Sequence, residues 1–265
     1  MSCSLVAKSW LEPSRRLLFA HISIRRDNYR SWLDNIPPRN TELLRYARSL
    51  TYFPRAEVGD SRLYCVYALR NYFPSFRQLR TLTLCNVVVE PTIHEHLGLL
   101  SAFQHMLSSL SLAQVSITWS AFVALVGCFP HLRNLNIRSS SFRVDDLPVP
   151  QLPRPLRGRL IIGPSHGSGM DSFFHLFPEL GPEYEELVIF GVYNQRLAAA
   201  LAESLRILKI YGCRRTYLWC VQYRTEHQLT RYYCPQWTLN QTSRLVHNFA
   251  SWRSSRHTQK NKSGF

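Results

Sequence analysis

The apolar residues of this chain recur in a fixed spacing: an aliphatic residue is followed by a second one three positions later and a third one two positions after that. The clear copies are Leu79, Leu82, Leu84; Leu107, Leu110, Leu112; Leu132, Leu135, Ile137; and Leu205, Leu208, Ile210. Weaker copies are Tyr184, Leu187, Ile189 and Arg157, Leu160, Ile162. Successive copies begin 21 to 28 residues apart. This pattern predicts strands that bury their apolar faces only when neighbouring units stack.

The segments between these strands have helical periodicity. Residues 92–95 form a capping box ahead of apolar residues at helical spacing. Ser120 is expected to cap a second helix that ends before Pro130, and Asn194 is expected to begin a third. Strand and helix alternating at this spacing imply parallel strands joined by right-handed crossovers. We therefore predict an α/β fold, a leucine-rich-repeat-like solenoid of parallel β-strands and returning helices.

Composition favours a globular chain in a reducing compartment. The 265 residues are 45% hydrophobic and 18% charged, enough apolar material for a sizeable core. The seven cysteines are odd in number and scattered, so no disulfide framework is expected, and no secretory segment follows Met1. Residues 110–129 carry no charge, but their first half alternates like a strand, so we expect no membrane segment. These features predict a cytoplasmic or nuclear location.

Positive charge is concentrated at the end of the chain. The formal net charge is +15, and residues 214–265 contain nine basic residues and one acidic residue, Glu226. The aromatic residues of this segment include Tyr217, Trp219, Tyr223, Tyr232, Tyr233 and Trp237. An Arg-rich aromatic tail can bind nucleic acid by counterion release and base stacking, although a solvated tail explains the same composition. We predict a disordered tail and keep nucleic-acid association as the alternative function.

The first residues resemble a known family. Residues 3–10 read C-S-L-V-A-K-S-W, followed by Pro13, by L-L-F at 17–19 and by a strand-like H-I-S-I at 21–24. This run resembles the second half of an F-box. Together with irregular leucine-rich repeats, it is similar to the basidiomycete fungal F-box-domain-containing proteins. Phrases at 128–135, 156–158 and 203–208 also match that group, so the resemblance extends roughly from Cys3 to Gly212.

The resemblance implies a partner, the Skp-type adaptor of a cullin-type ubiquitin ligase. Pro13 is expected to separate two short helices whose apolar residues would bind that adaptor: Leu5, Val6, Trp10, Leu17, Leu18 and Phe19. F-boxes of this type begin earlier, with an L-P-x-E-I-type helix, so we expect a truncated F-box. The predicted domains are F-box-like helices at 1–24, the solenoid at 25–213 and the basic tail at 214–265.

Three motifs have the form of chemical sites. Residues 163–167 match G-x-S-x-G, but Pro164 and the lack of a triad partner favour a turn over a nucleophile elbow. Cys213, Cys220, His227 and Cys234 are seven residues apart, without the tight Cys pair of a zinc knuckle. Residues 150–153 match P-x-x-P, which partner domains can bind and which inter-repeat loops also contain. We therefore predict no enzyme activity, metal or cofactor.

The predicted function is non-catalytic protein recognition, as the substrate-recognition subunit of a ubiquitin ligase. The non-leucine positions of the strands should form a concave face that binds an unidentified protein substrate, without membrane or nucleic acid as partner. The predicted binding residues are Arg80, Thr81, Thr83, Ser109, Ser111, Arg133, Asn134, Asn136, Arg206 and Lys209.

Overall fold

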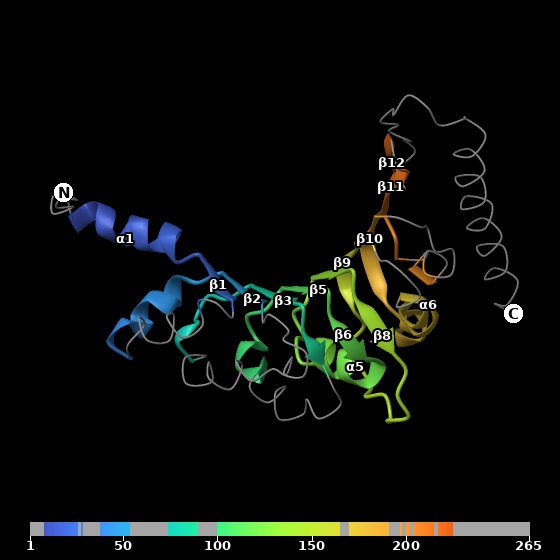
Figure 1. The fold of residues 1–265 in the computed structure, drawn as a ribbon, viewed down its shortest axis with the longest axis horizontal. Helices are drawn as coiled ribbons and strands as arrows, with labels where there is room; N and C mark the ends of the chain where they lie inside the picture. Colours follow the sequence, from blue (N-terminus) through green and yellow to red (C-terminus); the bar gives the residue numbers. More distant parts are fainter. Residues whose placement is uncertain are drawn as a thin grey trace, which may run out of the picture.

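A computed structural model describes residues 8–25, 28, 38–53, 74–89, 100–164, 170–190, 197, 200–201, 204–214 and 217–224. These residues form an α/β fold built on one large sheet, so the predicted fold class is confirmed at this level. The sheet has nine strands in the order β1-β2-β3-β5-β7-β9-β10-β11-β12. Figure 1 shows the sheet nearly edge-on, with β10 to β12 rising at one end.

The large sheet is parallel from β1 to β11, as predicted. Its strands are β1 (His21–Arg25), β2 (Ser49–Phe53), β3 (Thr81–Cys85), β5 (Ser109–Ala113), β7 (Asn134–Arg138), β9 (Arg157–Ile162), β10 (Glu183–Phe190) and β11 (Ile207–Arg214). β12 (Tyr217–Arg224) pairs antiparallel with β11. The predicted disordered tail at 214–265 therefore begins with a strand, because the antiparallel partner satisfies its backbone; residues 225–265 lie outside the described residues.

Two in-register rows of apolar side chains run across eight strands and form the core. One row is Ile22, Leu50, Leu82, Leu110, Leu135, Leu160, Leu187 and Leu208. The next is Ile24, Tyr52, Leu84, Leu112, Ile137, Ile162, Ile189 and Ile210. All of them are at most 8% exposed. The second and third positions of every predicted copy therefore face one shared core.

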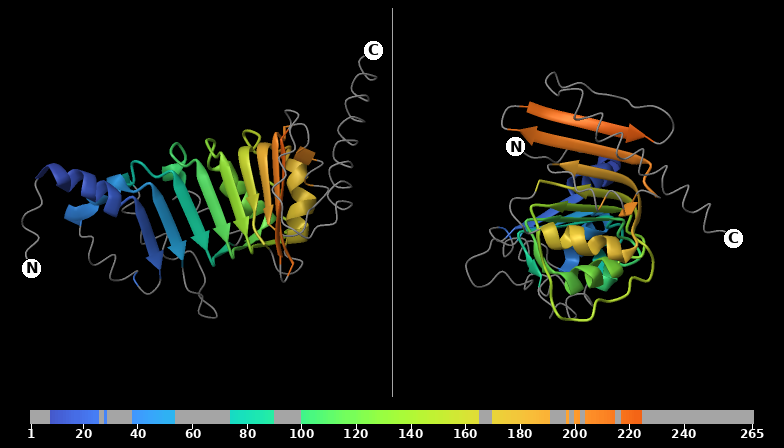
Figure 2. Two further views of the ribbon diagram at one scale, coloured as in Figure 1. Left: turned by 90° about the horizontal axis from the view of Figure 1, so that it is seen from above. Right: turned by 90° about the vertical axis from the view of Figure 1, so that its right-hand side faces the viewer.

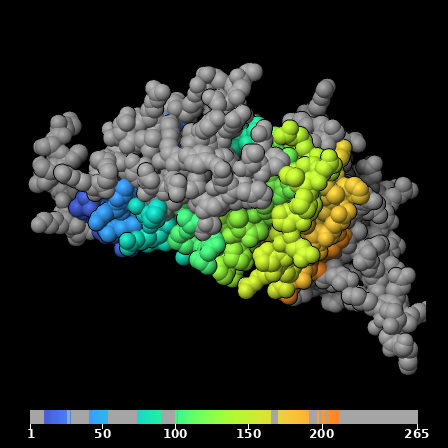
Figure 3. All heavy atoms as spheres, turned by 90° about the horizontal axis from the view of Figure 1, so that it is seen from below, coloured from blue at the N-terminus to red at the C-terminus, as the bar shows by residue number. Residues whose placement is uncertain are grey.

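Helical and short strand segments cover the core side of the sheet. A second, three-stranded parallel sheet joins β4 (Val88–Val89), β6 (Ser116–Thr118) and β8 (Ser141–Arg143). The helices α5 (Trp119–Gly127) and α6 (Asp171–Leu176) lie on the same side (Figure 1). The remaining helical segments are α1 (Lys8–Leu18) and the 3-10 helices η1 (Pro38–Tyr46), η4 (Ser101–Phe103) and η6 (Phe177–Leu180). Figure 3, seen from below, shows the segments following one another in chain order along the molecule.

Aromatic rings fill the space between the large sheet and these covering elements. Phe122 of α5 and Phe173 of α6 are fully buried, and their ring centroids are 5.9 Å apart. Phe173 also stacks on Phe177 at 4.5 Å, and Phe177 stacks on Tyr184 of β10 at 6.1 Å. Edge-to-face and stacked pairs of this kind add to the stabilisation from burial. They join successive units into one continuous core.

The structure corrects three local predictions. Helix α1 spans Lys8–Leu18 with Pro13 inside it, so Pro13 does not separate two helices. Ser120 does not cap α5; the helix begins at Trp119, and the Ser120 hydroxyl instead donates to the carboxylate of Asp145. In the copy assigned to Arg157, that residue is exposed and the neighbouring Leu156 is buried. The predicted helices at 92–95 and after Asn194 begin outside the described residues.

Candidate binding surface on the open face of the sheet

The face of the large sheet opposite the core is where a partner could reach the strands of the described residues. Among the described residues, no helix or strand lies over it from β1 to β9, as Figure 2 shows from above. Side chains alternate between the two faces of a strand, so every second residue reaches this face. We call this surface the open face.

Two polar rows cross the open face in register. The first contains His21, Ser49, Thr81, Ser109, Asn134, Arg159 and Glu186. The second contains Ser23, Thr51, Thr83, Ser111 and Asn136, then the apolar Ile161 and Val188, and Lys209. From Ser49 to Asn136 the polar members of both rows are partly exposed. The face therefore offers short hydroxyl and amide groups at the regular spacing of neighbouring strands, about 4.8 Å.

A row of arginines borders these rows where the strands begin. Arg48, Arg80 and Arg133 each lie one residue before a strand, and all three are exposed. Their backbones are stacked, because the Arg48 carbonyl accepts the N–H groups of Arg80 and Thr81 at 2.9 and 3.0 Å. The Arg80 carbonyl accepts those of Ser108 and Ser109 in the same way, at 3.0 and 2.9 Å. The ladder fixes the backbone positions from which these exposed side chains extend along one edge.

Charges on the β9 to β11 part of the face neutralise one another. The Glu186 carboxylate lies 3.3 Å from Nε of Arg159 on β9 and 2.9 Å from Nζ of Lys209 on β11. At the start of the same strands, Arg157 and Glu183 form an ion pair at 2.7 Å. Beyond them, the rings of Phe190 and Tyr211 stack with centroids 4.7 Å apart. These ion pairs therefore link β9, β10 and β11 across the face.

The structure places seven of the ten predicted concave-face residues on the open face, and the three arginines lie next to the starts of strands. Thr81, Thr83, Ser109, Ser111, Asn134 and Asn136 occupy the two polar rows, Arg80, Arg133 and Arg206 are exposed just before strands, and Lys209 is held by Glu186. Whether they bind a protein stays a prediction. Sequence reasoning missed the β2 contribution, Arg48, Ser49 and Thr51. The sequence does contain a copy of the repeat spacing at this strand, formed by Ala47, Leu50 and Tyr52. The residue types are atypical for the repeat, but all three are at most 3% exposed.

Helix α1 carries three of the four predicted adaptor-binding residues that the structure describes. Trp10, Leu17 and Leu18 are 67%, 79% and 74% exposed, and Leu11 is 46% exposed. Spacings of seven residues place these four side chains along one stripe of the helix. Phe19 follows the helix in a turn and is partly buried, while Leu5 and Val6 lie outside the described residues. The helix thus presents an apolar stripe to solvent.

The opposite side of α1 is held to η1 by a polar cluster. The Tyr46 hydroxyl donates to Glu12 at 2.5 Å, and Arg45 lies 3.9 Å from the same carboxylate. The pKa of Glu12 is lowered, mainly by the Tyr46 hydrogen bond; desolvation opposes this, and Arg16 and Arg45 contribute smaller lowering effects. These contacts fix which side of α1 faces outward.

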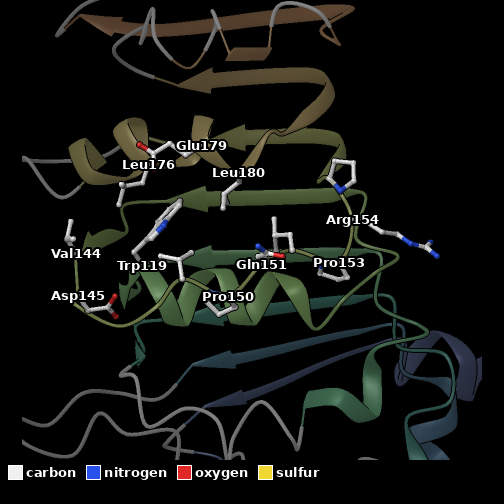
Figure 4. A pocket seen from close by; sticks show the side chains of 13 residues that line it. Trp119, Val144, Asp145, Pro150, Gln151, Pro153, Arg154, Leu176, Glu179 and Leu180 are labelled. Carbon is white, nitrogen blue, oxygen red and sulfur yellow. The ribbon is translucent and has the colours of Figure 1, made fainter.

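A separate hollow of about 610 Å³ lies beneath residues 144–156, the proline-rich loop between β8 and β9. Figure 4 shows Trp119 of α5 facing Leu176 and Leu180, with Pro150 and Pro153 along the other wall. The P-x-x-P residues therefore line this hollow. Asp145 at its end accepts hydrogen bonds from the backbone N–H of Ser120, at 3.4 Å, and from its hydroxyl. A carboxylate at this position stabilises the N-terminus of α5, so its role is structural.

Among the described residues, neither the G-x-S-x-G match nor the Cys and His series forms a chemical site. Gly163 directly follows β9 and its N–H donates to the Ile137 carbonyl at 2.6 Å, while Ser165 lies outside the described residues. Cys213 and Cys220 lie on β11 and β12 but are not opposite each other, and His227 and Cys234 lie outside. No group of three His, Cys, Asp or Glu side chains in the described ranges is placed to bind a metal.

Residues 110–129 form β5, β6 and α5 rather than one long helix. Within the part of the chain that the structure describes, no helix has the length and apolarity needed to cross a bilayer. In comparisons with known proteins, no family model, curated protein or solved structure matches the chain.

Proposed function

We propose that this chain is a leucine-rich-repeat-like scaffold that recognises proteins through the open face of its large sheet. The observation that supports this most is the separation of the strand residues into two faces. One face is a continuous apolar core, and the other exposes Ser, Thr, Asn and Arg in register across neighbouring strands. A core of this kind is maintained by the leucine positions alone, so the open face can vary to suit a partner.

We further propose that α1 binds a Skp-type adaptor, which would make the chain a substrate-recognition subunit of a cullin-type ubiquitin ligase. Its support is the F-box-like sequence at 3–24 together with the exposed stripe of Trp10, Leu17 and Leu18. Large apolar side chains that stay in solvent commonly mark a binding surface. The Glu12 and Tyr46 contact holds the helix by its other side and leaves the stripe free for a partner.

A pull-down of the full chain with recombinant Skp-type adaptor tests the ligase proposal. Wild-type chain is expected to retain the adaptor, and the Trp10→Ala and Leu17→Ala double variant is expected to lose it, since aromatic anchors dominate interface energies. The matched control is Val144→Ala and Val149→Ala, which removes two exposed apolar side chains from the proline-rich loop. Failure of the wild-type chain to bind, or equal loss in the control, would refute adaptor docking through α1.

A further inference from the structure

The first five strands of the open face, together with the residues just before them, carry an unbalanced positive charge. The segments 21–25, 48–53, 80–85, 108–113 and 133–138 contain five arginines and no Asp or Glu. Three of these, Arg48, Arg80 and Arg133, lie where strands begin, and two, Arg25 and Arg138, lie where strands end. All five side chains are exposed. The polar rows therefore run between two positively charged edges.

These arginines have no carboxylate partners within the described residues. The ion pairs of the open face lie on β9 to β11, where Glu183 and Glu186 neutralise Arg157, Arg159 and Lys209. Arg138 makes a hydrogen bond to the neutral Asn136 amide oxygen at 3.1 Å. Guanidinium groups form their strongest contacts with carboxylates or phosphates, often through two parallel hydrogen bonds. The β1 to β7 part of the face is therefore complementary to an anionic partner.

The side chains between the two edges favour a peptide over a nucleic acid. Single-stranded nucleic acids bind mainly by stacking their bases on aromatic rings. In the described β1 to β7 segments, Phe53 is the one Phe, Tyr or Trp with an open-face position, and it lies at a strand end. The rows themselves offer hydroxyl and amide groups, which match the N–H and C=O groups of an extended peptide. Five strands span about 19 Å, the length of roughly six extended residues.

We propose that the β1 to β7 part of the open face binds an acidic, extended segment of a partner protein. This inference rests on the proposed function and specifies the chemistry of the recognised substrate. Carboxylates of the segment pair with Arg48, Arg80 and Arg133 along one edge. Its backbone hydrogen-bonds to the Ser, Thr and Asn rows. The region from β9 to β11, where Glu183 and Glu186 pair with Arg157, Arg159 and Lys209, limits the site on that side.

Fluorescence anisotropy with the full chain and a labelled peptide of about ten alternating Glu and Ser residues, somewhat longer than the five-strand span, tests the proposal. The peptide is expected to bind, and its affinity to fall about tenfold or more in the Arg80→Glu and Arg133→Glu variant, because two attractive pairs become repulsive. The matched control, Arg143→Glu and Arg154→Glu, changes the net charge equally on β8 and in the proline-rich loop. It should retain most of the affinity.

Other outcomes would overturn the inference. If both double variants lower the peptide affinity equally, the net charge of the chain, including the basic tail, attracts the peptide, and the open face does not. Tighter binding of a single-stranded oligonucleotide of similar length, lost specifically on Arg80 and Arg133 reversal, would assign the face to nucleic acid. No peptide binding by wild-type chain would also refute it. Far-ultraviolet circular dichroism must show that each variant is folded. Binding of the adaptor through α1 is measured in a separate experiment, so either proposal can be refuted without the other.

Discussion

Glu186 and Lys209 form an ion pair across two neighbouring strands, with the Lys209 ammonium 2.9 Å from the carboxylate. Arg159 approaches the same carboxylate from the other side, at 3.3 Å. The Glu186 and Lys209 side chains are only 21% and 23% exposed. Glu186 therefore links β9, β10 and β11 on the side of the sheet that the apolar core does not reach.

Replacing Glu186 with Gln should lower the free energy of unfolding by about 1 kcal/mol. The change leaves two half-buried cations close together without their shared anion. Urea denaturation of Glu186→Gln and of Glu185→Gln measures the effect, because Glu185 is an exposed neighbour on the same strand. Equal stability of the two variants would show that the three-strand ion pair contributes nothing specific.

The stacked leucines should dominate stability. Leu110 lies fully buried in β5 between Leu82 and Leu135 of the adjacent strands. Leu110→Ala is expected to cost about 3 kcal/mol through lost burial and the resulting cavity. Ser111→Ala, at the next residue but on the open face, should change stability by less than about 0.5 kcal/mol. Similar losses at the two positions would contradict the assignment of faces.

Gly158 occupies a position that only glycine fits. Its φ is +96°, and a Cβ there would lie 2.2 Å from the Arg133 carbonyl oxygen. Gly158→Ala should therefore destabilise the protein by about 3 kcal/mol, combining backbone strain and collision. Gly181 also has positive φ, at +59°, but a Cβ there meets nothing within 4 Å, so Gly181→Ala should cost only about 1 kcal/mol. Thermal unfolding of the two variants gives the comparison, and the reverse order would be incompatible with the structure.

The attachment of α1 should depend on pH. The pKa of Glu12 is held below its usual value of 4.5, mainly by the Tyr46 hydroxyl. A carboxyl group with a lowered folded-state pKa contributes stability that is complete above its unfolded pKa and lost as pH falls through the folded value. Amide hydrogen exchange in α1, corrected for its intrinsic pH dependence, should therefore accelerate below about pH 4.5.

Tyr46→Phe provides the matched variant for this titration. It removes the hydroxyl and keeps the ring, so the pKa of Glu12 should rise toward its ordinary value and α1 should be less protected even at neutral pH. An unchanged Glu12 titration, followed by nuclear magnetic resonance, would remove Tyr46 as the main cause.

The sequence allowed the parallel α/β sheet to be predicted because its leucine spacing directly reflects strand alternation. The copy formed by Ala47, Leu50 and Tyr52 was not identified from the sequence, because a small and an aromatic residue replace aliphatic ones. Packing between β1 and β3 nevertheless buries these residues as fully as the clear copies. The pairing of β12 with β11 was not predicted, because an antiparallel pair at a sheet edge is held by backbone hydrogen bonds, which leave no side-chain pattern in the sequence. Asp145 at the start of α5 lies 25 residues from Ser120, so no local pattern reveals it.

The candidate surface was predictable for the same geometric reason. Once Leu82 and Leu84 face the core, Thr83 must face the other way. What the spacing does not reveal is which charges neutralise one another. Glu186 could be matched with Arg159 and Lys209 only when the register of β9, β10 and β11 was known, because a one-residue slip would move each side chain to the other face.

The account depends most on the open face being the surface that a partner covers, and a native thiol there can test it. Cys85 lies on the open face at the end of β3, whereas Cys128 packs beside the core at the end of α5. Burial raises the pKa of both thiols, so both should react slowly with a maleimide at neutral pH.

Peptide-resolved mass spectrometry of maleimide labelling, with and without the Glu and Ser peptide, gives the decisive comparison. Bound peptide should slow the labelling of Cys85 several-fold and leave Cys128 unchanged. Unchanged labelling of Cys85 under conditions where anisotropy shows the peptide bound would contradict the claim that the open face is the recognition surface.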